Sequence, residues 1–394
     1  MAKILFFNVP AHGHVNATFP LVRELVERGH EVRYYCSDEF QASIERSGAT
    51  FCAYPISAPD AAEVVNGISS NLSSLVRLLL EMSEVLVPFA IEEIEREQPD
   101  LVMYDAITLW GKIAARATKS RDVVLFTIMA FNNLWVLGMR RVLEFARMAI
   151  PEFPRIVWLR RKIDRKYGPE ALGKQFFPVK GQTNIVFLPR IFQPENRFVD
   201  DSFIFVGPSI DPSSRPEQDW QPLETELPQV YISLGTIHNA NTDFYRTAFA
   251  AFGDYPSQFV LSVGPKTDIS QLEPIPDNFL VKNSVPQLRV LQDVDAFITH
   301  GGMNSMQEGL YYGVPQVVVP QQMEQLVNAL RIDDLGAGIW LDVDAGITPD
   351  MLCDALDRVL NEAHFWTKAQ EVSIQSQTAG GYKGAADAIE SLVN

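Results

Sequence analysis

Residues 299–325 carry side chains whose types and spacing suit the binding of a pyrophosphate group. They read T-H-G-G-M-N-S-M-Q-E-G-L-Y-Y-G-V-P-Q-V-V-V-P-Q-Q-M-E-Q. The pair Gly301–Gly302 lets the backbone turn and approach a ligand closely. Asn304 or Ser305 is placed to cap the helix that follows, and a helix start offers N–H groups and partial positive charge to phosphate oxygens. His300, just before the turn, adds a hydrogen-bond donor.

Two histidines near the N-terminus are candidates for a general base. His12 and His14 follow the first predicted strand, and open α/β sheets bind ligands at the carboxyl ends of their strands. The residues alone do not separate the two histidines, and a structural role for either stays open. Asp105 follows the predicted strand Leu101–Tyr104. It either caps a helix that begins near Ile107 or orients a histidine base.

The elements that position these residues alternate between strand and helix patterns. Apolar runs predict strands in the N-terminal half at Ile4–Val9, Glu31–Cys36, Thr50–Tyr54, Leu101–Tyr104 and Val123–Thr127. Amphipathic patterns predict helices at Asn16–Arg28, Glu39–Arg46 and about Leu75–Arg96. A second alternating block begins at Gln229, after the linker-like stretch D-P-S-S-R-P-E-Q-D-W-Q-P. Its predicted elements are a helix at Thr242–Phe252 and strands at Val230–Ser233, Gln258–Val263, Leu280–Lys282, Ala296–Ile298 and Gln316–Val319. This alternation predicts parallel, doubly wound sheets.

These motifs resemble the donor-binding signature of the family-one UDP-glycosyltransferases, most closely its bacterial macrolide- and flavonoid-glycosylating branch. The resemblance extends over nearly the whole chain. The matching segments are Pro10–Thr18, Pro99–Asp105, Tyr231–Thr236, Val285–Gln287, His300–Gly302, Glu308, Gly313–Pro315, Pro320, Glu324–Gln325 and Ala379–Ala386.

The resemblance implies an α/β fold of the GT-B type, in which two Rossmann-like domains face a central cleft. Residues 1–210 would form an acceptor-binding domain and residues 211–224 a linker. Residues 225–362 would form the domain that binds the sugar nucleotide. The last helices, in residues 363–394, would cross back to the first domain.

The resemblance also assigns roles to single residues. It favours His14 over His12 as the base, with Asp105 as its partner. The residues that would hold the donor are Thr236, Val285, Gln287, His300, Gly302, Asn304, Ser305, Glu308, Glu324 and Gln325. Of these, His300, Asn304 and Ser305 would meet the diphosphate. The Asp and Glu residues are not clustered as they would be at a metal site, so a UDP-sugar co-substrate is expected without a metal or other cofactor.

Two positions depart from the family pattern. Ala17 replaces a proline in the first motif, which is a mild change at a helix start. Ser284 stands where the family usually has an aromatic residue that stacks on uracil. Preference for uridine over another base is therefore an open question.

The acceptor is expected to be a hydroxylated hydrophobic small molecule. Several large apolar residues would line or underlie its pocket, namely Ile107, Trp110, Phe131, Trp135 and Met139. Each of them also fits an ordinary core position.

The formal net charge of −16 and the sequence pI near 4.9 argue against nucleic acid as a partner. No apolar run is long enough for stable membrane insertion. The three cysteines are too scattered for a disulfide framework or a zinc site, and they fit a cytoplasmic location. We expect a monomer or a weak dimer.

One basic segment stands out in this acidic chain. Residues 140–166 hold nine Lys or Arg against Glu144, Glu152 and Asp164. The segment is either a solvated helical cover over the acceptor pocket or a surface that recognises an acidic acceptor or a membrane.

The residues and the resemblance together therefore predict an inverting, metal-independent transferase. It is expected to move a hexose, with glucose as the expected sugar, from a UDP-sugar to a hydroxyl of a lipophilic compound such as a macrolide or flavonoid. Two alternatives are another GT-B enzyme, such as a sugar-nucleotide epimerase, and a non-catalytic partner that activates a second enzyme. The histidine–aspartate pair and the residues of the donor motif favour the transferase.

Overall fold

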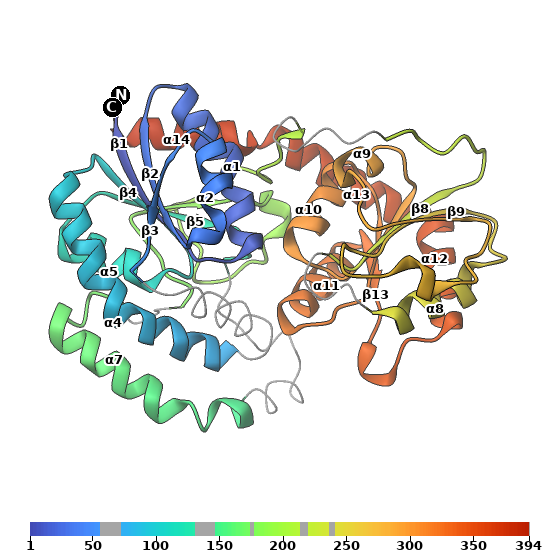
Figure 1. Ribbon diagram of the computed structural model, residues 1–394, viewed down its shortest axis with the longest axis horizontal. Coiled ribbons are helices and arrows are strands. Elements are labelled where there is room, and N and C mark those ends of the chain that lie inside the picture. Colours follow the sequence, from blue (N-terminus) through green and yellow to red (C-terminus); the bar gives the residue numbers. More distant parts are fainter. Residues whose placement is uncertain (56–71, 131–145, 174–176, 213–219, 236–240, 394) are drawn as a thin grey trace. The chain divides into compact units, whose positions relative to one another are not determined.

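The computed structural model describes residues 1–55, 72–130, 146–173, 177–212, 220–235 and 241–393. The chain forms two compact units. Unit 1 comprises Met1–Ile210 together with Ala379–Asn394, and unit 2 comprises Asp211–Thr378. Each unit is a parallel sheet covered by helices (Figure 1). The predicted α/β class with two Rossmann-like units is confirmed.

Unit 1 contains a seven-stranded sheet in the order β3-β2-β1-β4-β5-β6-β7. Its strands are β1 (Lys3–Phe7), β2 (Glu31–Cys36), β3 (Thr50–Ala53), β4 (Leu101–Asp105), β5 (Asp122–Phe126), β6 (Thr183–Val186) and β7 (Phe203–Phe205). The helices are α1 (His12–Glu27), α2 (Gln41–Arg46), α4 (Leu72–Glu97), α5 (Leu109–Ala117), α7 (Phe153–Tyr167) and α14 (Gly381–Val393), with short 3-10 turns at Asp38–Phe40 and Arg190–Phe192. All neighbouring strands pair in parallel, so their carboxyl ends meet at one edge.

Unit 2 contains a six-stranded parallel sheet in the order β10-β9-β8-β11-β12-β13. Its strands are β8 (Gln229–Ser233), β9 (Gln258–Ser262), β10 (Phe279–Lys282), β11 (Ala296–Thr299), β12 (Gln316–Val318) and β13 (Gly338–Trp340). The helices are α8 (Thr242–Phe252), α9 (Gln287–Val290), α10 (Met303–Tyr311), α11 (Met323–Leu335), α12 (Pro349–Asn361) and α13 (Ala363–Thr378), with 3-10 turns at Ile269–Leu272 and Val343–Ala345.

The core of each unit lies on both faces of its sheet, because these strands are apolar on both sides. In unit 1, Phe6 and Tyr34 pack under α1, α2 and α14. On the opposite face, α5 approaches β4 so closely that a Cβ on Gly111 would lie 2.5 Å from Tyr104 Cβ.

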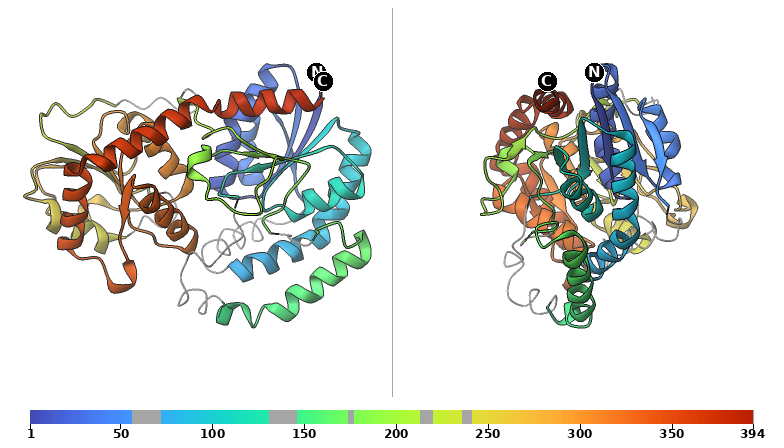
Figure 2. Two further views of the ribbon diagram at one scale, coloured as in Figure 1. Left: turned by 180° about the vertical axis from the view of Figure 1, so that it is seen from behind. Right: turned by 90° about the vertical axis from the view of Figure 1, so that its left-hand side faces the viewer.

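The C-terminal helix α14 belongs to unit 1 although it lies far from that unit in sequence. Arg28, which directly follows α1, donates hydrogen bonds to Asp387 at 2.6 Å and Glu390 at 2.7 Å, and Ile389 is fully buried in the core. Gly380 and Gly381, with φ values of 99° and 56°, form the turn between α13 and α14. α13 packs against α10 and α12 within unit 2, so the return to unit 1 begins at Ala379 and not at residue 363 (Figure 2).

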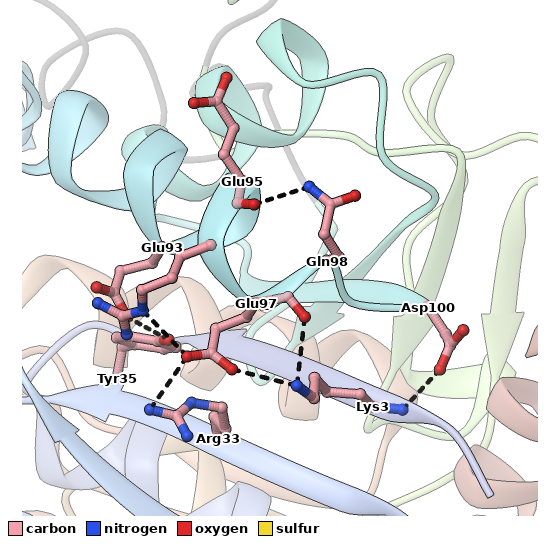
Figure 3. A network of polar contacts seen from close by, with 9 residues as sticks. Lys3, Arg33, Tyr35, Glu93, Glu95, Glu97, Gln98 and Asp100 are labelled. Carbon is pink, nitrogen blue, oxygen red and sulfur yellow. Dashed lines mark hydrogen bonds and ion pairs between the residues drawn. The ribbon is translucent and has the colours of Figure 1, made fainter.

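A polar network fixes α4 to strands β1 and β2 of the unit 1 sheet (Figure 3). The Tyr35 hydroxyl donates to Glu93 at 2.8 Å, and Lys3 Nζ donates to the Glu97 carboxylate at 3.2 Å. The Lys3 backbone N–H donates to Asp100 at 2.7 Å. Because Lys3 begins β1, the ion pair between Lys3 and Glu97 lies at the sheet edge opposite the one that carries His14 and Asp105. Among the described residues, no helix combines the length and the apolar content needed to cross a membrane.

Candidate functional site

The carboxyl edge of the unit 1 sheet brings His14 and Asp105 together. His14 Nδ1 lies 2.8 Å from Asp105 Oδ2, although 91 residues separate the two in sequence. α1 begins at His12 rather than at Asn16 as predicted, so His14 lies in its first turn and not in a loop. The Asp105 side chain is fully buried and that of His14 is 11% exposed. Of the two side chains, only that of His14 is therefore accessible to solvent.

Asp105 uses its two oxygens for different contacts. Oδ1 accepts the backbone N–H of Ile107 at 2.9 Å, and Oδ2 faces His14. α5 begins at Leu109 after Thr108, so Asp105 is not the helix cap that the sequence allowed. A carboxylate accepts hydrogen bonds, so this geometry assigns the proton of the neutral imidazole to Nδ1 and the basic lone pair to Nε2.

His12 has different surroundings. Its side chain is 49% exposed, and its Nε2 lies 2.8 Å from Glu39 Oε1, which is also exposed. Its ring also meets the Phe40 ring edge-on, with 4.9 Å between centroids. The structure thus separates two histidines that the residues alone left equal: His14 has a buried carboxylate partner, and His12 a solvated one.

Thr127 is a third member of the unit 1 site that the sequence analysis did not name. Its Oγ1 lies 3.0 Å from His14 Nδ1, and the residue is 4% exposed. Thr127 follows β5, and β5 pairs with β4 so that Asp105 is in register with Leu125. The signal for it was present in the sequence, because Thr127 ends the strand predicted next to that of Asp105.

In unit 2 the glycine turn leads from β11 into α10 as predicted. Gly301 has φ of 85°, which favours glycine, and Gly302 is the extended residue before the helix. The cap is therefore Gly302, and the prediction that Asn304 or Ser305 caps α10 is wrong. Both residues lie in the first turn, half-buried, where backbone N–H groups have no partner within the helix.

The imidazole of His300 is packed between two glycines. A Cβ on Gly235 would lie 2.5 Å from His300 Cε1, and a Cβ on Gly302 would lie 2.5 Å from His300 Nε2. Gly235 also has φ of 80°. These two positions let the ring lie against the backbone at the start of α10, where an anion would bind.

Three polar side chains from separate elements of unit 2 form a chain. Tyr231 of β8 donates to Gln287 Oε1 at 3.2 Å, and Gln287 Nε2 donates to Glu308 Oε2 at 2.6 Å. Glu308 is 5% exposed. Val285 is half-buried just before Gln287, and Ser284 is exposed. The structure thus places Gln287 and Glu308 in direct contact, which the sequence did not indicate.

The start of α11 braces the loop that follows β12. Gln325 Oε1 accepts the backbone N–H of Gln321 at 2.7 Å, and Glu324 is half-buried beside it in the first turn. Asn328, one turn further on, donates to the Gly301 carbonyl at 2.9 Å. Asn328 therefore links α11 to the glycine turn. The sequence analysis did not include it, because the contact depends on how α11 packs.

The remaining predicted residues fall into two groups. Ile107 and Trp110 are buried, and Trp110 Nε1 donates to the Tyr54 hydroxyl at 3.1 Å. Thr236, Phe131, Trp135 and Met139 lie outside the described residues. Within the described part of the chain, no group of three or more His, Cys, Asp or Glu side chains could hold a metal ion.

Comparison with known proteins links these features to one family. Residues 247–380 match the C-terminal domain of erythromycin biosynthesis protein CIII-like proteins. The chain is 35% identical over 391 residues to the NDP-glycosyltransferase YjiC of Bacillus subtilis (strain 168), covering 99% of this chain and 97% of the relative. It is 30% identical to demethyllactenocin mycarosyltransferase of Streptomyces fradiae, covering 100% of this chain and 87% of that protein. The crystal structure of CalG4, the calicheamicin glycosyltransferase, superposes with a TM-score of 0.84 at 28% identity, covering 100% of this chain and 98% of that one.

Proposed function

Since the chain belongs to the macrolide type of the family-one UDP-glycosyltransferases, we propose that it moves glucose from UDP-glucose to a hydroxyl group of a lipophilic small molecule. That it is a glycosyltransferase follows from its relatives. The observation that supports the proposed chemistry is the 2.8 Å contact between His14 Nδ1 and the buried Asp105. A base oriented in this way can take the proton of an alcohol as it attacks.

His14 would act through Nε2. The acceptor hydroxyl gives its proton to this nitrogen while its oxygen forms a bond to C1 of the sugar. Asp105, fully buried, holds the ring in orientation and stabilises the imidazolium that results. Thr127 Oγ1, 3.0 Å from His14 Nδ1, further restricts the rotation of the ring.

The first turn of α10 and His300 would receive the leaving diphosphate. The bond between C1 and the diphosphate oxygen breaks as the new bond forms on the opposite face, so the configuration at C1 inverts. The backbone N–H groups of Asn304 and Ser305 lie in that first turn, and the His300 ring packs against Gly302. Helix N–H groups and an imidazole donor can stabilise the departing charge without a metal ion.

The other donor contacts are proposed from the same part of unit 2. Glu308 would accept the ribose hydroxyls, and Gln287 with the Val285 backbone would meet the base edge. Glu324 and Gln325 would bind the sugar hydroxyls, and Thr236 would approach phosphate. Because Ser284 is exposed and not aromatic, the base would lack the usual stacking partner, so TDP-glucose is the donor to compare with UDP-glucose.

The acceptor class is proposed from the relatives. One relative is named for its action on demethyllactenocin and one similar structure for calicheamicin, and both names denote natural products. A macrolide, flavonoid or related phenol with an accessible hydroxyl is the acceptor we propose. Cys36, Cys52 and Cys353 are free thiols, as a reducing cytoplasm would keep them.

Neither alternative has support of its own. The relatives reported above are named as transferases, which disfavours a sugar-nucleotide epimerase. A non-catalytic partner has no need for a histidine held by a buried carboxylate, yet His14 has such a partner.

A transfer assay read by mass spectrometry tests the proposal. UDP-glucose or TDP-glucose is mixed with pooled macrolide and flavonoid acceptors, with EDTA present throughout. We expect acceptor masses that increase by one hexose, and a β-linked product in the NMR coupling of the anomeric proton. Loss of turnover with EDTA would contradict the metal-independent mechanism, and an α-linked product would contradict inversion.

A further inference from the structure

Helix α7 carries a basic and aromatic stripe on its outer face. The stripe consists of Pro154, Val157, Trp158, Arg161, Lys162 and Arg165, which line one shallow hollow on the surface. Their spacing of three or four residues places them on one side of a helix. None of them belongs to the sites described above.

The opposite side of α7 packs against the rest of unit 1. Leu159 and Ile163 are buried, and α7 runs alongside α4 at the outside of the unit (Figures 1 and 2). Ion pairs fix this orientation, since Arg155 lies 3.0 Å from Glu81 and Lys162 lies 2.7 Å from Glu84. The outer stripe therefore faces away from the core.

The Lys and Arg side chains of α7 outnumber the acidic side chains that pair with them. α7 holds six Lys or Arg against the single acid Asp164. Within the parts of the chain that the structure describes, no acidic group pairs with Arg161, Arg165 or Lys166. This concentration of positive charge contrasts with a formal net charge of −16 for the whole protein.

Large apolar side chains are exposed next to these charges. Trp158 is 49% exposed, with the Arg155 guanidinium 4.6 Å and the Lys162 ammonium 5.2 Å from its ring centroid. Phe153 at 64% and Ile150 at 69% extend the apolar surface at the N-terminal end of the helix. Aromatic rings flanked by long cationic side chains suit the boundary between lipid headgroups and acyl chains.

We propose that α7 docks unit 1 on an anionic lipid surface, with Trp158, Phe153 and Ile150 at the acyl boundary and Arg161, Arg165 and Lys166 among the headgroups. The helix would lie in the plane of the surface. The net negative charge of the protein opposes approach at long range, but at physiological salt this repulsion is screened beyond about 8 Å. At contact the local positive charge of α7 determines binding to the lipid surface. Each cation near an anionic leaflet strengthens binding about fivefold.

Vesicle flotation of the full-length protein tests this proposal. We compare phosphatidylcholine vesicles with vesicles in which about a third of the lipid is phosphatidylglycerol, a typical anionic composition for such tests. The wild-type protein should float with the anionic vesicles, show little binding to the neutral ones, and dissociate as salt is raised. Replacing Arg161 and Arg165 by Gln should weaken the partition constant roughly 30-fold, because two cations are lost.

Matched variants separate a specific surface from general effects. Lys266→Gln with Lys383→Gln removes two exposed cations elsewhere and should leave binding unchanged. Trp158→Ala should weaken binding, whereas Trp366→Ala, which truncates a side chain that is 59% exposed on α13, should not. Circular dichroism verifies that each variant is folded.

Several outcomes would overturn the proposal. Absence of wild-type binding to anionic vesicles would do so, as would equal binding to neutral ones. If the charge variants of α7 and their controls lost vesicle binding equally, the effect would come from the total charge of the protein and not from α7. If the α7 variants instead abolish self-association of a protein that does not float, the stripe is an interface between copies of this chain.

Discussion

Asp105 holds the backbone with one oxygen and a histidine with the other, although it does not cap helix α5. The sequence offered a backbone-capping role and a role beside a histidine as alternatives. The structure gives Oδ1 to the Ile107 N–H and Oδ2 to His14. The backbone contact fixes the carboxylate, which in turn fixes the imidazole. An aspartate held from both sides orients a base better than one that is able to rotate.

Replacement of Asp105 by Asn tests this orientation. The amide keeps the size of the side chain but can present its NH₂ group to Nδ1, which favours the wrong tautomer. We expect kcat to fall by roughly 10³-fold or more, with the affinity for UDP unchanged. Steady-state kinetics and UDP titration measure the two quantities.

Thr127→Val provides a graded comparison, because it removes one neutral hydroxyl 3.0 Å from the same nitrogen. About a fivefold loss in kcat is expected, corresponding to about 1 kcal/mol. If Asp105→Asn and Thr127→Val lowered kcat by equally small factors, the proposal that His14, oriented by Asp105, is the catalytic base would be contradicted.

At the scale of elements, the glycine turn and the β8 end together seat His300. Gly235→Ala adds a Cβ that would lie 2.5 Å from the imidazole, at a φ of 80°. The ring must move, so we expect UDP affinity to fall roughly 10-fold, by about 1.4 kcal/mol. Isothermal titration with UDP measures it.

Gly346→Ala is the matched control for this substitution. Gly346 has φ of 81°, and a Cβ there would meet nothing within 4 Å. It therefore carries the same backbone strain without displacing the His300 ring. Equal UDP affinity in the two variants would show that His300 does not bind the diphosphate.

Helix α5 contains a buried lysine whose ionisation should be visible in stability. Lys112 is 4% exposed and donates to the Leu172 carbonyl at 2.9 Å. Burial lowers the pKa of Lys112 from 10.5 to about 8. Above pH 10.5 the side chain of Lys112 is neutral in both states, and its contribution to stability is fully present. This contribution is lost as the pH falls through 8, because the folded protein then buries a charge.

The free energy of unfolding of the wild-type protein, relative to Lys112→Met, should therefore rise between pH 8 and 10.5 by up to about 3 kcal/mol. Urea unfolding at a series of pH values measures this difference. Lys266→Met, at an exposed position, should run parallel to the wild type. If the free energy of unfolding of Lys112→Met also ran parallel to that of the wild type over this pH range, the lowered pKa of Lys112 would be contradicted.

The elements differ in how well the sequence predicts them. Leu101–Tyr104 and Ala296–Ile298 are short apolar runs, which is the pattern of strands buried on both faces. β13 is missed because it has three residues and begins with Gly338, which reads as a break. In the structure a Cβ on Gly338 would lie 2.2 Å from the Gln316 carbonyl oxygen, so close pairing with β12 requires this glycine.

The same distinction holds for the site. Asp105 is predictable as a site residue because it directly follows a strand that the sequence reveals. The residues place two histidines after the first strand, and only the family resemblance favours His14 over His12. The contact between Gln287 and Glu308 and the contact of Asn328 with Gly301 join separate elements, and their distances depend on packing. The start of α1 is missed because Gly13 is a poor helix former.

At the scale of the whole molecule, unit 1 is completed by the end of the chain. Ile389 of α14 is fully buried in the unit 1 core. Ile389→Ala should destabilise unit 1 by about 2–5 kcal/mol. Hydrogen exchange resolved by peptide should show faster exchange in unit 1 and unchanged exchange in unit 2. Ile374→Ala, at a position 63% exposed on α13, should change stability by less than about 0.5 kcal/mol.

The central claim, that His14 is the catalytic base, is tested most directly by comparing two neighbouring histidines. Transfer rates and UDP affinity are measured for His14→Ala and His12→Ala. We predict that His14→Ala loses roughly 10²- to 10⁴-fold in kcat while still binding UDP, and that His12→Ala retains its rate, because its partner Glu39 is solvated. Near-full activity in His14→Ala, or an equal loss in both variants, would contradict the account.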